Sequence, residues 1–151
     1  MTAANSQRNS TAGAGWDQRV APGLDDFERL ARRAFDQLPA HFRQMCGEIV
    51  FVVQDLADGE ALDSLGIEDP FELMGLYQGV SLDRKATLDP GREPDMVFLY
   101  RRAILDYWAE TGSDTIGDVV THVIVHEIGH HFGLSDDDME RIEATADPGR
   151  T

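Results

Sequence analysis

The spacing of hydrophobic residues changes several times between residues 20 and 146, which predicts a mixture of helices and strands. From Leu24 to Leu38 apolar residues recur at three- and four-residue spacing, so we expect an amphipathic helix that Pro39 ends. Three short apolar runs then predict strands, at residues 49–53, 73–80 and 96–100.

Turn-forming residues separate these strands, and two helical patterns follow them. Asp58-Gly59, residues 66–70, Asp89-Pro90-Gly91 and Pro94 are typical of loops. Residues 102–110 form the next helical pattern. The predicted order is therefore helix, three strands and helix, before a final helical segment.

The final segment, residues 115–143, predicts a long helix with a broad apolar face. Gly133 stands where a left-handed C-terminal cap is expected. A short helix over residues 136–145 should follow, because Ser135 and Asp138 have the spacing of a capping box.

The two ends of the chain differ in composition from this patterned region. Residues 1–19 mix small and polar residues with almost nothing to bury, and residues 147–151 are similar. We therefore expect a flexible lead at 1–19, one domain at 20–146 and a flexible tail at 147–151.

The composition excludes several functional classes. The chain has 28 acidic and 13 basic side chains, a formal charge of −15, which disfavours nucleic acid and anionic membranes as partners. No apolar run is long enough for a membrane span, and the polar N-terminus does not resemble a signal peptide. A single cysteine, Cys46, predicts a cytoplasmic protein and a buried thiol.

The chemistry is concentrated in the long predicted helix, which contains His126-Glu127-Ile128-Gly129-His130. Four residues advance a helix by about 400°, so the two imidazoles project from nearly the same side. This spacing lets both nitrogens bind one metal ion, at about 2.0–2.1 Å for zinc. Glu127 follows the first histidine, where it reaches a metal-bound water rather than the metal.

The residues after this motif offer a third ligand. Gly133 permits a turn that brings Asp136 back beneath the helix, at the position where metzincins place a third histidine. Asp136 is also favourable in the first turn of the short helix, because a negative charge there interacts well with the helix dipole. An aspartate in this turn can still bind the metal, so the two interpretations are compatible. Glu140 and Glu143 are alternative third ligands, as in zincins that take a glutamate from a later helix.

The remaining histidines and the tyrosines have weaker predicted roles. We expect His122 and His131 to lie around the metal ligands or on the helix surface, and we assign no role to His41. Tyr77 and Tyr100 are candidates for stabilising an oxyanion, although buried packing is the favoured interpretation of both.

The segment HEIGHHFGLSDDD, residues 126–138, resembles the small bacterial zincin-like metallopeptidases. Leu76-Tyr77-Gln78-Gly79 and residues 98–102 add to the resemblance, which covers about residues 24–146. It implies a compact α+β zincin-like fold, with a short mixed sheet packed against the helix that carries HExxH. It also implies zinc held by the residues matching His126, His130 and Asp136, with Glu127 as the catalytic carboxylate.

One feature of larger metzincins is missing from this sequence. Met139 follows Asp136 too closely to form a Met-turn, so the support beneath the metal must come from elsewhere.

The expected activity is a zinc-dependent metallopeptidase that cleaves peptides or proteins, with Glu127 as general base toward a zinc-activated water. We expect a monomer that binds its peptide substrate along the strand at 73–80. The alternatives are a metal-dependent RNase resembling ribosome-associated bacterial metalloRNases, and a zinc-binding module without catalytic activity. Glu127 and the charge of −15 count against the RNase.

Overall fold

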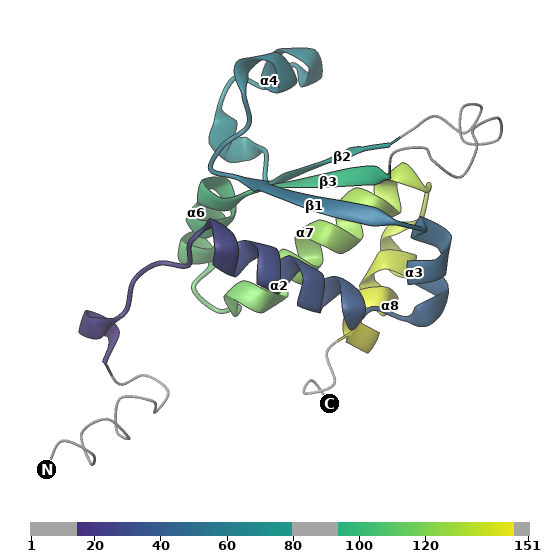
Figure 1. Cartoon of the computed structure of the whole chain (residues 1–151), viewed down its shortest axis with the longest axis horizontal. Helices are drawn as coiled ribbons and strands as arrows, with labels where there is room; N and C mark the ends of the chain where they lie inside the picture. The colour runs from purple at the N-terminus through teal and green to yellow at the C-terminus, as the bar shows by residue number, and fades with distance from the viewer. Residues whose placement is uncertain (1–14, 80–93, 147–151) are drawn as a thin grey trace, which may run out of the picture.

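A computed structural model describes residues 15–79 and 94–146 (Figure 1). The predicted loop at 89–91, the end of the strand predicted at 73–80, and most of the predicted flexible ends lie outside the described residues. The α-helices are α2 (Leu24–Asp36), α3 (Ala40–Cys46), α4 (Gly59–Leu65), α6 (Arg101–Thr111), α7 (Ile116–His131) and α8 (Asp136–Ala146). Two 3₁₀ turns, η1 (Trp16–Gln18) and η2 (Pro70–Glu72), accompany the strands β1 (Ile49–Gln54), β2 (Gly75–Gln78) and β3 (Asp95–Tyr100).

The three strands form one mixed sheet in the order β1-β3-β2. β1 runs parallel to β3, whereas β2 is antiparallel to β3 and lies at an edge of the sheet. Helices α2 and α7 cover one face of this sheet, and α4 lies beyond the opposite face (Figure 1). The predicted α+β architecture, with a short mixed sheet packed against the helix that carries HExxH, is confirmed.

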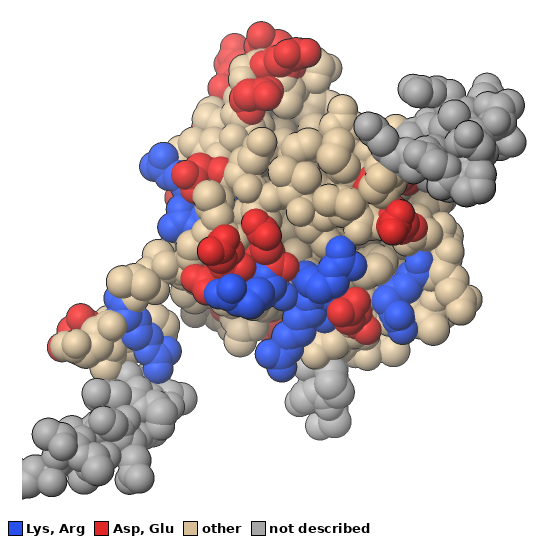
Figure 2. Space-filling view, viewed as in Figure 1, with Lys and Arg blue, Asp and Glu red and all other residues tan. Residues whose placement is uncertain are grey.

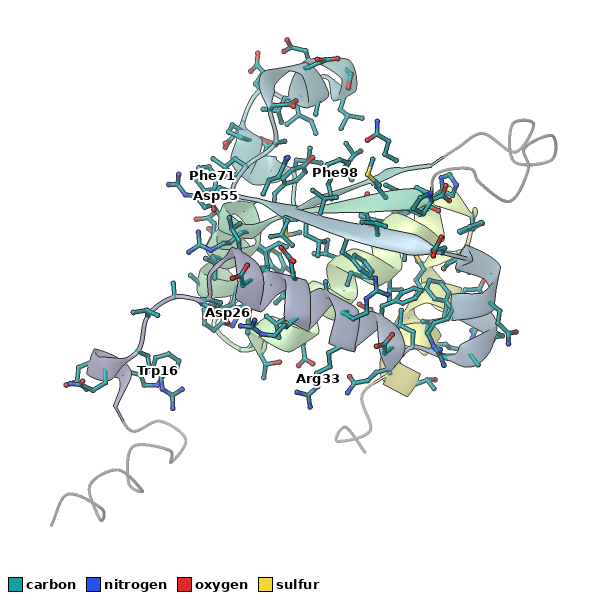
Figure 3. All side chains as sticks on the ribbon, in the orientation of Figure 1. Trp16, Asp26, Arg33, Asp55, Phe71 and Phe98 are labelled. Carbon is teal, nitrogen blue, oxygen red and sulfur yellow. The ribbon has the colours of Figure 1, made fainter. Side chains whose placement is uncertain are left out.

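The main core fills the space between the sheet and the helices α2 and α7. Phe27, Leu99, Ile124 and Ile128 are fully buried there. On the other face of the sheet, Phe98 projects toward α4 (Figure 3) and belongs to a smaller apolar cluster. Because both faces are covered, β3 is apolar along most of its length and shows little alternation of polar residues.

Two short helices were not predicted from the sequence. Gly59 begins α4 instead of lying in a loop, because the Asp58 side chain caps the helix by accepting a hydrogen bond from the Ala61 backbone N–H at 2.8 Å. Helix α3 is also short and buries only Phe42 and Cys46. With so few buried positions, neither helix produces a clear hydrophobic period.

The turn between α7 and α8 agrees with the sequence prediction. Gly133 has φ = 75°, and the backbone N–H of Leu134 donates to the Gly129 carbonyl at 2.9 Å, as in a Schellman motif. The capping box is also present, since Ser135 and Asp138 each accept a hydrogen bond from the other's backbone N–H. This turn reverses the chain and packs α8 against α7 (Figure 1).

The contact between α7 and α8 depends on the absence of a side chain at Gly129. Met139 is fully buried against this glycine, and a Cβ atom built on Gly129 would lie 2.8 Å from Met139 Cγ and even closer to Met139 Sδ. A buried methionine enclosed on all sides has little room to move away. The glycine therefore sets how closely the two helices approach.

We expect Gly129→Ala to lower the free energy of unfolding by about 1–3 kcal/mol, because the added methyl group overpacks the α7–α8 contact. The matched control is Gly117→Ala on the same helix, where the nearest atom to a Cβ is Thr115 Oγ1 at 3.9 Å. That control should be neutral or stabilising, by up to about 1 kcal/mol, because alanine favours helices. Urea denaturation measures both, and equal stability of the two variants would contradict the prediction.

Candidate metal centre on helix α7

Helix α7 carries the predicted chemical residues, and its buried apolar residues are spread around most of its circumference. The Thr115 side chain caps its N-terminus by accepting a hydrogen bond from the Asp118 backbone N–H at 3.0 Å. Residues facing the core are Val119, Val120, Val123, Ile124, Val125, Ile128 and Gly129. His126 and Glu127 are half-buried and His130 is exposed, so all three lie at the boundary between core and solvent.

The two histidines of the HExxH motif lie close together, as their spacing predicts. Their ring centroids are 5.7 Å apart and the rings are inclined at 64°. Burial lowers the pKa of His126, and the neighbouring His122 adds to this effect. A neutral imidazole is the form that binds a metal ion, so the surroundings of His126 favour ligation.

Glu127 lies beneath the edge strand β2. A Cβ atom built on Gly75 would lie 3.2 Å from Glu127 Cγ and 2.8 Å from Val123 Cγ1, so the strand backbone almost touches the helix. The backbone N–H of Tyr77 donates a hydrogen bond to the Glu127 carboxylate. Burial raises the pKa of Glu127, while His130 and this hydrogen bond act in the opposite direction.

A second group of ligand-type side chains forms on the side of α7 that faces α8. Glu143 Oε1 lies 2.7 Å from His122 Nδ1, and Glu143 Oε2 lies 3.9 Å from His126 Nε2. The rings of His122 and His126 are 4.0 Å apart. Among the described residues, these three form the group of histidine, cysteine and carboxylate side chains whose ligand atoms lie within 4.8 Å of one another.

The predicted third ligand, Asp136, is the first residue of α8 and is exposed. Its charge acts on His126 by raising the pKa of the imidazole, so it lies within electrostatic range. Neither Asp136 nor His130 belongs to the close His122–His126–Glu143 group in the described part of the chain. Zinc ligation by His126, His130 and Asp136 therefore stays a prediction.

The link between His122 and Glu143 was only partly predicted from the sequence. The sequence predicts Glu143 as an alternative third ligand and His122 as a residue around the site, but it predicts no contact between them. The sequence feature that points to His122 is its spacing from His126. The two lie one helical turn apart, like His126 and His130, so they share one side of the helix.

Tyr77 is half-buried, and its side chain is held by two contacts with neighbouring residues. Its hydroxyl donates a hydrogen bond to Asp95, a carboxylate that is only 2% exposed, and its ring stacks on His131 at 3.9 Å. Burial and the Asp95 carboxylate raise the pKa of Tyr77, which keeps the hydroxyl protonated as a donor. Tyr100 is only 2% exposed, which confirms buried packing for this tyrosine.

A family model described as zincin-like metallopeptidase matches residues 46–146, a range that runs from the last residue of α3 to the end of α8. No curated protein matched the chain. None of the helices in the described ranges combines the length and apolarity that a bilayer crossing requires.

We expect Tyr77→Phe to lower the free energy of unfolding by roughly 1.5–3 kcal/mol, because the buried Asp95 carboxylate loses a hydrogen-bond donor while the ring stacking persists. Tyr107→Phe is the matched control, since Tyr107 is 38% exposed and should change stability by less than about 0.5 kcal/mol. Chemical denaturation of both variants measures the difference, and a Tyr77→Phe protein as stable as the control would contradict the assigned hydrogen bond.

Proposed function

Because the chain belongs to the zincin-like metallopeptidase family, we propose that it is a zinc-dependent peptidase with Glu127 as its general base. The observation that carries the proposal is the position of Glu127. This carboxylate directly follows the first histidine of the motif and faces the edge strand along which a peptide would bind. A base between a metal ligand and a peptide-binding edge is the arrangement that peptide hydrolysis requires.

The donor set around His126 fits a zinc ion. His126 and His130 supply two imidazoles from one helix, and Asp136 supplies a carboxylate from the first turn of α8. These three residues would hold the metal with one coordination position open, which is typical of catalytic zinc and unlike structural zinc. Bound zinc supplies Lewis acidity, which lowers the pKa of a water molecule and polarises a carbonyl group.

Glu127 is suited to take up a proton and return it. Its raised pKa, caused by burial, moves the carboxyl toward the range in which both proton transfers occur near neutral pH. The hydrogen bond from the Tyr77 backbone N–H holds the carboxylate under β2. Glu127 would accept the proton of the attacking water and deliver it to the leaving amine.

The edge strand β2 is the proposed docking site for the substrate. Within residues 15–79 and 94–146 it pairs with β3 on one side only, and we propose that its outer side takes up an extended peptide. Gly75 keeps this strand close to Val123 and Glu127, which places a docked peptide near the base. We further propose that the protein acts as a monomer on peptide or protein substrates.

Glu127→Gln should lower peptide hydrolysis by about 10²–10⁴-fold while zinc content stays unchanged, because the amide cannot accept the proton. The control is Glu110→Gln, an exposed glutamate on α6, which should keep wild-type activity. A quenched-fluorescence peptide library and elemental mass spectrometry measure the two quantities. Full activity in Glu127→Gln would refute the role of this residue.

Asp136→Asn should raise the zinc concentration needed for half-maximal hydrolysis by at least tenfold, since groups that merely support metal ligands already contribute about 10–100-fold to affinity. The neighbouring exposed carboxylate offers a close control, because Asp137→Asn removes the same charge one residue away. The measurement is reactivation of metal-free protein by zinc. If the two variants respond alike, Asp136 is not the third ligand.

A further inference from the structure

Glu143 bridges two histidines that lie one turn apart on α7. One carboxylate oxygen is 2.7 Å from His122 Nδ1, and the other is 3.9 Å from His126 Nε2. Two imidazole nitrogens and a carboxylate oxygen are a donor set that zinc, cobalt and nickel accept. A modest movement of these half-buried side chains would bring all three donors to bonding distance of one ion.

We propose that His122, His126 and Glu143 form an alternative metal position, displaced along α7 from the His126–His130 pair and selective for zinc-like divalent ions. An ion there would replace the proton between His122 Nδ1 and Glu143, so that binding releases this proton to solvent. His126 is common to both positions. Since its Nε2 atom can bind only one ion, the two positions are alternatives.

The alternative position is turned away from the proposed base. Five residues advance a helix by about 500°, so His122 and Glu127 point about 140° apart around α7. His130 lies on the other side of His126, within about 60° of Glu127. An ion bound at the alternative position therefore lies on a different side of α7 from Glu127, and Glu127 cannot act on a water bound to it. This consequence rests on the proposed function.

A cavity gives ions and water access to this group. His122 and Glu143 line a cavity of about 460 Å³, together with Asp114 and Asp118 near the start of α7. Arg33 projects from α2 on the same side of the molecule and also contributes to the lining (Figure 3). The volume accommodates water molecules that complete the coordination sphere, and the two aspartates attract cations.

The surface near the cavity carries charges of both signs, since Arg33 lines it together with Asp114, Asp118 and Glu143. Figure 2 shows acidic and basic side chains interleaved over α2, whereas the surface over the sheet is largely uncharged. The chain's formal charge of −15 favours the accumulation of cations near it. The cavity, with its carboxylates from α7 and α8, lies against the α2 side of the core.

The experiment counts zinc by native mass spectrometry in the His130→Ala background, where the HExxH pair is broken and the proposed group is intact. We expect His130→Ala to retain about one zinc ion per chain. Adding His122→Ala or Glu143→Gln should lower the retained zinc at least tenfold at the same free concentration. The matched control adds His41→Ala, which removes an exposed histidine remote in sequence from the group and should leave the zinc bound.

Two outcomes would overturn the alternative position: His130→Ala without zinc, or equal zinc in the His122→Ala and His41→Ala double variants. Circular dichroism establishes that the variants are folded, and exposed His130 makes unfolding unexpected. His122→Gln in the same background is the second variant should the alanine variant fail to fold. Because zinc counting uses no substrate, an inactive wild-type protein would refute the proposed peptidase and leave this result intact.

Discussion

Helix α7 is held between the edge strand β2 and helix α8 by two close contacts, and both require a glycine. At Gly75 the strand backbone meets Val123 and Glu127, and at Gly129 the helix backbone meets the buried Met139. A side chain at either position would separate layers that are packed at the density of a protein core. The chemistry that we propose for α7 depends on both contacts, because strand β2 reaches Glu127 from one side and α8 reaches His122 and His126 from the other.

This arrangement gives neighbouring residues of one helix different electrostatic surroundings. Burial lowers the pKa of His126 and raises that of Glu127, so each is displaced toward its neutral form. His122 differs, because its hydrogen bond with Glu143 raises the pKa of the imidazole. Neutral His126 favours a metal ion, and a carboxylate that is easily protonated favours proton transfer.

The sequence predicted best what depends on local interactions. The long helix, the left-handed Gly133 and the capping box from Ser135 to Asp138 follow from residues a few positions apart. The contact between His122 and Glu143 spans a chain reversal, so it depends on how α8 packs and not on spacing alone. Tyr77 and Asp95 likewise meet only because β2 pairs with β3. Such contacts become visible only when the tertiary packing is known.

Met139 shows how α8 can support the proposed metal site without a Met-turn. This side chain packs beneath Gly129, inside the HExxH segment, and fixes the rotation of α8 against α7. Glu143 follows Met139 by four residues, which places the two side chains about 40° apart on the helix. The buried methionine therefore directs Glu143 toward His122 and His126. The same short helix begins with Asp136, so one packing contact orients both carboxylates that compete for the metal ion in our proposals.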